Sequence, residues 1–291
     1  MKSPPRRRSC LSVPGSSEKM LAKAIGLPAD EIVLDLEDAV PPAGKVEARG
    51  RIARLLTDET WRARLVAVRI NAIGTPWWKD DVLAAAASRH PRLTLVVPKV
   101  ESPADLASVD QVLANTVNDV GGVGTQALIE TARGLAGVQP IASASDRLQA
   151  LILGYADLAA SLGRPAGSTA SWLPAQHAIL LAARVNGLQA IDGPFLQIET
   201  GDALRRDAEN IAALGFDGKW AIHPSHIAIL NTAFTPRVEE VERARSLLAH
   251  LDEAQRTGSG ASSFQGMMID EAMRMSALRT LERAGESVES E

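Results

Sequence analysis

The chain has 291 residues, of which 46% are hydrophobic and 23% charged, so it has ample material for a globular core. Its formal net charge of −4 provides no basic field for nucleic acid, although Arg6-Arg7-Arg8 forms a short local cluster. No stretch is apolar for long enough to span a bilayer, and a single cysteine, Cys10, excludes an internal disulfide or a thiolate metal cluster. We therefore expect a cytoplasmic protein that binds neither nucleic acid nor a membrane.

Short β-rich runs alternate with helix-like segments along most of the chain. The runs expected to be strands are 9–13, 31–34, 65–68, 93–97, 125–129, 149–154, 188–191 and 219–222. Segments with apolar residues at helical spacing include 44–56, 77–88, 102–117, 174–186 and 202–214. Eight such repeats at this length predict an α/β fold, a (β/α)8 TIM barrel, over residues 1–232. A doubly wound open sheet is the alternative.

Residues 233–291 differ in character from the part before them. Residues 236–255 form a charged, amphipathic helical pattern, and small residues then fill 257–263. The apolar segment 264–270 carries one acid, Asp270, and leads into a last helix that ends near Ala284. The pattern predicts C-terminal helices with a hinged lid or a swapped arm.

Charged or histidine side chains follow most of the expected strands. They are Asp35, Glu37, Asp38, Arg69, Lys99, Glu130, Asp157, Asp192 and His223. Glu130 comes directly after the buried run 125–129, and an ionised carboxylate is rarely buried without a partner. Because barrel active sites form where the strands end, these positions predict an active site. Glu130 alone could also be a helix-start acid that the helix dipole stabilises.

A set of short motifs lies at these strand ends and in the C-terminal tail. They are Val13-Pro14-Gly15, Leu34-Asp35-Leu36-Glu37-Asp38-Ala39-Val40, Val68-Arg69-Ile70-Asn71, Pro98-Lys99, Ile129-Glu130-Thr131-Ala132-Arg133-Gly134, Asp157-Leu158-Ala159-Ala160-Ser161-Leu162-Gly163, Ala190-Ile191-Asp192-Gly193, Ile222-His223-Pro224-Ser225 and Phe264-Gln265-Gly266-Met267-Met268-Ile269-Asp270. In this order the chain resembles the HpcH/HpaI aldolase and citrate lyase superfamily, in the citrate lyase β-subunit-like branch that includes malyl-CoA and citramalyl-CoA lyases. The resemblance implies an Mg²⁺-dependent lyase that cleaves or forms a carbon–carbon bond between an acyl-CoA and a small 2-oxo acid.

The same resemblance places Glu130 and Asp157 at the family's two metal-binding carboxylates. Mg²⁺ takes oxygen ligands, often from one or two carboxylates, and leaves its other positions to water and substrate. A 2-oxo or 2-hydroxy acid that chelates this ion has its oxygen polarised by Lewis acidity. We therefore expect Mg²⁺ to be the cofactor.

Two further residues match catalytic positions of the family. Arg69 matches the substrate arginine, whose planar fork can hold a carboxylate or an enolate oxygen; a structural ion pair with Asp35 or Glu37 is the alternative. Asp270 matches the tail aspartate that serves as acid/base and is delivered by a neighbouring subunit's lid; a helix N-cap is the alternative. The resemblance thus implies a homo-oligomer, a trimer, whose subunits share the lid.

Other charged residues match supporting positions. Asp35, Glu37 and Asp38 lie beside the metal in the family, and their mutual repulsion should raise at least one pKa unless cations or backbone donors compensate. Lys45 and Arg49 match basic positions that contact the CoA phosphates, with a solvated helix face as the alternative.

The sequence leaves three hypotheses about activity. The first is a lyase that cleaves citramalyl-CoA or malyl-CoA to acetyl-CoA and pyruvate or glyoxylate. The second is a metal-dependent 2-oxo-acid aldolase acting on free acids. The third is a citrate lyase β-like subunit that works only on a thioester of an acyl carrier protein.

Overall fold

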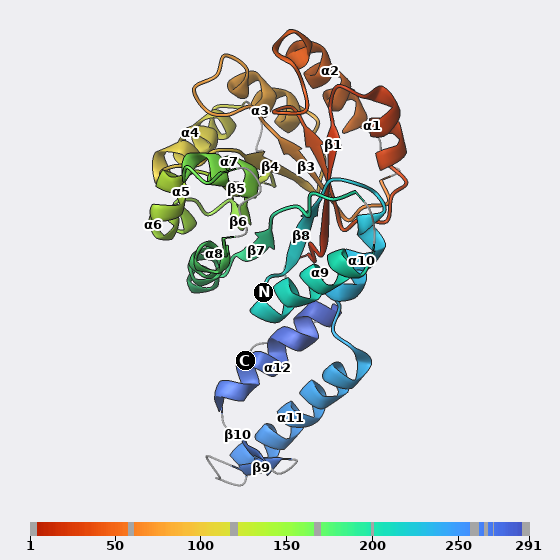
Figure 1. Cartoon of the computed structure of the whole chain (residues 1–291), viewed down its shortest axis with the longest axis vertical. Helices are drawn as coiled ribbons and strands as arrows, with labels where there is room; N and C mark the ends of the chain where they lie inside the picture. The colour runs from red at the N-terminus through yellow and green to blue at the C-terminus, as the bar shows by residue number, and fades with distance from the viewer. Residues whose placement is uncertain are drawn as a thin grey trace. The chain divides into compact units, whose positions relative to one another are not determined.

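Eight parallel strands close into a barrel in a computed structural model of the chain (Figure 1). The structure describes residues 5–57, 61–116, 122–165, 170–198, 201–256, 262–264, 267–269 and 271–286. The strands are β1 Ser9–Pro14, β2 Glu31–Asp35, β3 Leu65–Arg69, β4 Leu93–Val97, β5 Gly124–Ile129, β6 Leu148–Leu153, β7 Gln189–Asp192 and β8 Gly218–Ala221. Cys10 of β1 is in register with both Glu31 of β2 and Trp220 of β8, so the sheet has no open edge. The predicted TIM barrel is confirmed, and the open sheet is excluded.

Helices connect the strands and surround the barrel (Figure 1). They are α1 Glu18–Ala24, the 3-10 helix η1 Pro42–Gly44, α2 Lys45–Leu55, α3 Trp78–Ala87, α4 Pro103–Ala114, α5 Ala132–Ala136, α6 Val138–Ala142, α7 Tyr155–Ser161, α8 Leu173–Val185, α9 Asp202–Leu214 and α10 His226–Ala233. The predicted helix start at Ser102-Pro103 is confirmed, because Ser102 and Asp105 form a reciprocal capping box. Gly215 adopts the left-handed conformation that ends α9.

The interior of the barrel has three layers along the strand direction. At the amino-terminal end, Arg7 donates to Glu31, and Glu31 also accepts from Gln126 and Thr94. The middle is apolar and draws a side chain from every strand: Cys10, Val33, Ala67, Val96, Leu128, Ala150, Ile152, Ile191 and Trp220. Side chains alternate between the two faces of a strand, so the residue two positions beyond each inner one also faces inward.

This alternation brings charged residues to the carboxyl ends of the strands. The next inward-facing residue after Val33 of β2 is Asp35, and after Ala67 of β3 it is Arg69. After Leu128 of β5 it is Glu130, which directly follows the strand. The three charged side chains are therefore directed into the mouth of the barrel by the same period of two that buries the apolar layer.

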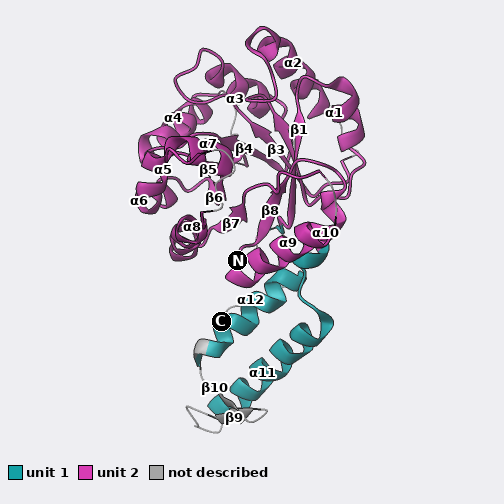
Figure 2. Cartoon of the chain, viewed as in Figure 1, with its two compact units in different colours: residues 1–6, 232–291 teal, residues 7–231 magenta. Residues whose placement is uncertain are grey.

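The chain divides into two compact units, residues 7–231 and residues 232–291 with 1–6 (Figure 2). In the smaller unit, α11 Val238–Arg256 packs against α12 Glu271–Ala284. Their shared apolar contact consists of Ala244, Leu247, Leu251, Ala277 and Leu281. An ion pair of 2.6 Å between Arg274 and Asp252 also joins the two helices.

The segment predicted to be a hinge contains regular structure. Ser262 and Ser263 belong to β9 Ser262–Phe264, which pairs antiparallel with β10 Met267–Ile269. Residues 257–261 and the predicted acid/base Asp270 lie outside the described residues. Among the described helices of both units, none is long and apolar enough to cross a membrane.

Candidate active site

Arg69 is the centre of an ion-pair cluster at the ends of β2 and β3. It is in register with Asp35, and its Nε and Nη2 donate to the two Asp35 oxygens at 2.8 and 2.6 Å. Its Nη1 reaches Glu37 Oε2 at 2.9 Å and Asp38 Oδ2 at 3.3 Å. Burial alone would lower the pKa of Arg69, but the hydrogen bonds and charge of Asp35 raise it above its ordinary value. The guanidinium is therefore a permanent cation held in one orientation.

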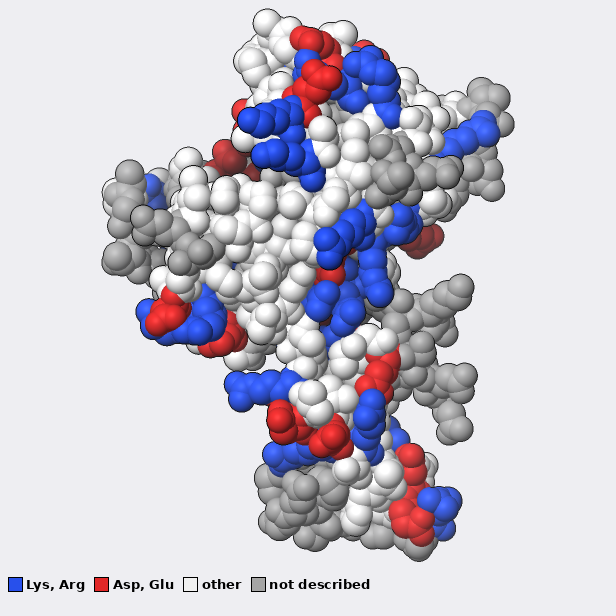
Figure 3. All heavy atoms as spheres, turned by 90° about the vertical axis from the view of Figure 1, so that its right-hand side faces the viewer, with Lys and Arg blue, Asp and Glu red and all other residues white. Residues whose placement is uncertain are grey.

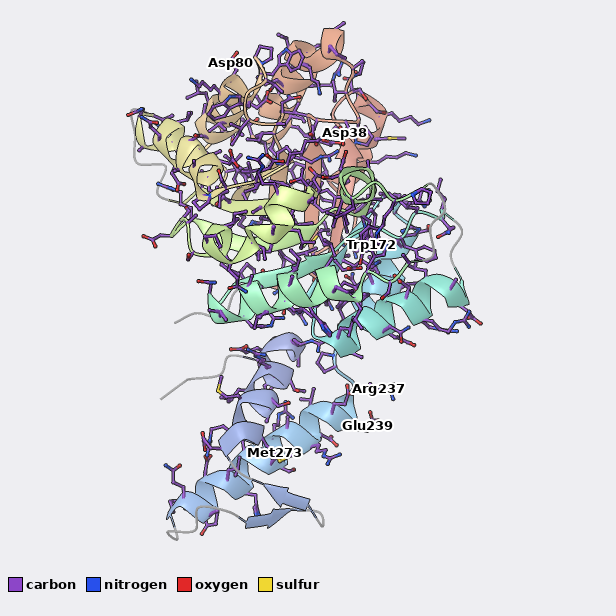
Figure 4. The ribbon with its side chains drawn as sticks, turned by 60° about the vertical axis from the view of Figure 1, so that its left-hand side comes forward. Asp38, Asp80, Trp172, Arg237, Glu239 and Met273 are labelled. Carbon is purple, nitrogen blue, oxygen red and sulfur yellow. The ribbon has the colours of Figure 1, made fainter. Side chains whose placement is uncertain are left out.

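The acids around Arg69 differ in their surroundings. Asp35 is buried and also accepts the backbone N–H of Glu37 at 2.8 Å. Asp38, which follows β2, is exposed (Figure 4). Glu37 is buried and receives a second cation, because Lys99 Nζ lies 2.6 Å from its Oε1. Burial nevertheless raises the pKa of Glu37 against the opposing charges of Arg69 and Lys99.

Glu130 directly follows β5 and is a nearly fully buried acid. Its Oε1 accepts the backbone N–H of Lys99 at 2.9 Å. Burial, with smaller contributions from the charges of Glu37 and Asp157, raises the pKa of Glu130 to about 8, although Lys99 and Arg69 oppose the change. The surroundings of Glu130 therefore provide too little positive charge to stabilise its ionised form, and a bound metal cation would supply that charge.

Asp157 is half-buried in the first turn of α7, just after β6, the strand that pairs with β5. Its charge is one of those that raise the pKa of Glu130. The mouth holds the acids Asp35, Glu37, Asp38, Glu130 and Asp157 and the cations Lys45, Arg69 and Lys99. At full ionisation these five acids would outnumber the three cations by two.

This donor set fits a divalent, oxygen-preferring cation between Glu130 and Asp157. The described residues include no group of three or more His, Cys, Asp or Glu side chains that could hold a metal. Mg²⁺ needs no such group, because water and substrate oxygens complete its octahedron. The residues present thus fit Mg²⁺ better than a structural zinc, which takes four protein ligands.

Lys45 and Arg49 of α2 both bind protein atoms. Lys45 is buried and donates to the carbonyl oxygens of Leu36 at 2.8 Å and Glu37 at 2.6 Å. Arg49 binds Asp81 at 2.7 Å, and Asp81 in turn accepts from the backbone N–H of Asn71 at 3.0 Å. The alternative of a solvated helix face is therefore wrong for Lys45, and contact with CoA remains a prediction for both.

The surface in Figure 3 carries clusters of Lys and Arg with acidic side chains among them.

A second hydrogen-bond and ion-pair network, at the ends of β7 and β8 and the start of α7, was not predicted from the sequence. The Tyr155 hydroxyl donates to Asp192 and accepts from Gln176 at 2.7 Å. Lys219 forms ion pairs with Asp192 and, at 2.9 Å, with Asp207. The signal in the sequence was Asp192 itself, an acid at the end of β7 that needed a buried cation. Because Tyr155 and Asp157 share the first turn of α7, this network holds the helix start that carries Asp157.

Trp172 and His223 also have structural partners. Trp172 stacks against the ring of Tyr155 at 5.0 Å and under the guanidinium of Arg164 at 3.8 Å (Figure 4). His223 Nδ1 makes a 2.6 Å hydrogen bond with the hydroxyl of Ser225, two residues along the chain. Of these contacts, the hydrogen bond of His223 closes a local turn after β8.

Comparison with known proteins supports the assignment of the fold and identifies the family. The HpcH/HpaI aldolase/citrate lyase family is matched over residues 8–224. An L-malyl-CoA/β-methylmalyl-CoA lyase of Cereibacter sphaeroides is 37% identical, with 92% of each chain covered. A (3S)-malyl-CoA thioesterase of the same species is 36% identical and covers 95% of this chain and 94% of the relative.

Solved structures give the same relationship. Protein CitE of Mycobacterium tuberculosis, crystallised with magnesium, acetoacetate and coenzyme A, aligns with a TM-score of 0.77 and 33% identity. The alignment covers 96% of this chain and 98% of that one. A citrate lyase from Burkholderia xenovorans aligns with a TM-score of 0.82 and 25% identity over 99% and 94% of the two chains.

Proposed function

Because the chain belongs to the HpcH/HpaI aldolase/citrate lyase family, we propose that it is an Mg²⁺-dependent carbon–carbon lyase acting on a 3-hydroxyacyl-CoA. Malyl-CoA and citramalyl-CoA are the substrates that we propose, with acetyl-CoA and a 2-oxo acid as the products. The observation that carries the proposal is the pair Glu130 and Asp157, which lie close enough for the charge of Asp157 to raise the pKa of Glu130, in a mouth that also holds the fixed cation Arg69.

Glu130 and Asp157 would hold the metal, and Mg²⁺ bound there would polarise the oxygen of a 2-oxo acid that chelates it. Arg69 keeps its orientation because Asp35 occupies two of its donors, and this leaves the guanidinium charge fixed toward the mouth. A fixed cation stabilises developing negative charge without reorganisation at the moment of reaction.

Cleavage needs one proton to leave the substrate and one to return. A base removes the proton of the 3-hydroxyl, the C2–C3 bond breaks, and its electron pair becomes the enolate of acetyl-CoA, which an acid then protonates. We assign both transfers to Asp270, on the basis of the motif that it shares with the family. A lid that carries this residue would also keep water away from the enolate.

The direct test is turnover of malyl-CoA and citramalyl-CoA with Mg²⁺ by the purified protein, followed as acetyl-CoA release. The variants Glu130→Gln and Asp157→Asn keep the side-chain shape and remove the charge, so each should lower kcat/KM at least about a hundredfold. Exposed Glu18→Gln in α1 serves as the charge-matched control. Wild-type turnover in either site variant would contradict the proposal.

A thioesterase is the second candidate, since one relative of nearly equal identity carries that activity in its name. The two reactions give different products from malyl-CoA. The lyase yields acetyl-CoA and glyoxylate, whereas the thioesterase yields malate and free CoA. Product analysis by chromatography therefore distinguishes them. Release of free CoA without acetyl-CoA would favour the thioesterase.

The other two activities predicted from the sequence have their own tests. An aldolase on free acids should keep its activity when the chain is truncated before Gly258, whereas the lyase should lose it. A carrier-protein subunit should co-purify with its carrier and show no activity on CoA thioesters. We further propose that the protein is a homotrimer in which each lid completes a neighbour's site. The apolar packing of α11 against α12 supports a C-terminal unit that is held together by contacts of its own.

A further inference from the structure

Lys99, directly after β4, contacts two acids of the mouth through two different parts of the residue. Its backbone N–H donates to Glu130 Oε1 at 2.9 Å. Its ammonium lies 2.6 Å from Glu37 Oε1 and 3.9 Å from Asp38 Oδ1. One residue thus connects the end of β5 with the acidic segment that follows β2.

The backbone of Lys99 is in the left-handed region, with φ of +51°. Among the described residues that are not glycine, only Arg89 shares a positive φ, and Arg89 lies exposed in the turn after α3. Side chains with a Cβ atom disfavour this conformation, so it persists where a surrounding contact outweighs the strain. At Lys99 the contacts are the backbone hydrogen bond to Glu130 and the ion pair of the ammonium with Glu37.

The preceding residue explains why this donor is needed. Pro98 has no N–H, so Lys99 provides the first backbone donor beyond the end of β4. Glu130 Oε1 takes that donor, while its Oε2 faces Gly154, the N-cap of the helix that carries Asp157. The bond therefore holds Glu130 with Oε1 on Lys99 and with Oε2 beside the residue that precedes α7.

We propose that Lys99 is a positioning residue of the metal site. Its left-handed backbone holds Glu130 Oε1 on the N–H and so sets the orientation in which this carboxylate would meet the cation. Its ammonium separately holds Glu37 against Arg69. This inference rests on the proposed function, because it takes Glu130 to be a metal ligand.

Substitutions can separate the two contributions of Lys99. Lys99→Met removes the ammonium and leaves the strain of a side chain in the left-handed region. Lys99→Gly also removes the ammonium but relieves that strain. Lys99→Val removes the ammonium and adds a β-branched side chain, for which a positive φ is far less accessible. The backbone contribution is therefore measured by comparing Val with Met, at equal charge.

The experiment is calorimetric titration of the metal-free variants with Mg²⁺, with circular dichroism to establish folding. We expect the Gly and Met variants to bind Mg²⁺ alike, and the Val variant to bind about tenfold more weakly than Met, as for other supports of a metal ligand. Lys99→Gly should also melt at a higher temperature than Lys99→Met.

Equal affinities of folded Met and Val variants would overturn the inference. A lower Mg²⁺ affinity of Lys99→Gly than of Lys99→Met would also overturn the inference. This second comparison can be made even if Lys99→Val does not fold. The proposed function fails in a different way, since wild-type protein would then take up no Mg²⁺ at all.

Discussion

Gly154 lies so close to Glu130 that a Cβ atom added to it would be 2.6 Å from Glu130 Cβ and 2.7 Å from Oε2. These distances are shorter than van der Waals contact, so the end of β6 must lack a side chain for Glu130 to keep its position. The smallest residue of the chain thus makes room for the carboxylate that the proposed metal needs.

Gly154→Ala should therefore displace the Glu130 carboxylate. We expect a loss of about 1–3 kcal/mol in the free energy of unfolding, as for other overpacked interiors, and at least about a tenfold weaker affinity for Mg²⁺. Urea unfolding and calorimetry measure the two effects. Gly50→Ala is the matched control, because a Cβ there has open space except for Arg54 Nη1 at 3.9 Å. Unchanged Mg²⁺ binding by Gly154→Ala would show that Glu130 does not need this space.

Replacement of Arg69 tests its planar fork. Arg69→Lys keeps the charge but cannot donate to both oxygens of Asp35 and also to Glu37, so kcat/KM should fall about a hundredfold or more. Arg69→Met leaves Asp35 buried without its cation and should cost about 3–5 kcal/mol of stability. Exposed Arg205, paired with Asp202, provides the control, since Arg205→Lys should change stability by less than about 1 kcal/mol. Full activity of Arg69→Lys would show that the site needs only the positive charge of Arg69 and not its planar fork.

His226, at the start of α10, gives the protein a pH-dependent stability. Its ring is buried, and burial lowers its pKa below the ordinary 6.5, helped by the charges of His223 and Lys219 and opposed by backbone contacts with Ile198 and Gln197. The unfolded chain therefore binds a proton at a higher pH than the folded chain. This contribution to stability is complete above pH 6.5 and is lost as the pH falls toward the lowered folded pKa.

Urea unfolding at pH 7.5 and pH 5.5 measures this effect. The wild-type free energy of unfolding should decrease between the two values, and His226→Gln should show a smaller decrease. His177→Gln, at an exposed site on α8, should leave the wild-type decrease unchanged. An equal decrease in wild type and His226→Gln would assign the effect to other groups.

The shared lid can be tested by mixing two inactive variants. Asp270→Asn lacks the proposed acid/base, and Glu130→Gln lacks a proposed metal ligand. If one subunit's lid serves another's barrel, random reassembly of equal amounts should restore about a quarter of wild-type activity. Light scattering on the same sample gives the oligomeric state. No recovery in mixed oligomers would mean that lid and barrel act within one chain.

Much of the barrel was predictable because it depends on local patterns. Short β-rich runs, turn residues and helix-spaced segments alternate eight times, and the strand boundaries agree with the structure to within a few residues. The hinge was predicted less well. Small residues indicate flexibility, yet Ser262 and Ser263 pair with the nearby β10, because strand pairing depends on the partner strand and not on the composition of one segment.

The sequence by itself determined that acids and bases lie at the ends of the strands, because the period of two that buries Val33 and Leu128 also turns Asp35 and Glu130 inward. Only the tertiary structure decided which of them meet. Arg69 binds Asp35 because the register of β2 with β3 places the two side by side, and Lys99 reaches Glu130 because its backbone adopts a positive φ. Register and burial arise from contacts between segments far apart in the chain, so the pairing and the raised pKa of Glu130 exist only in the folded protein.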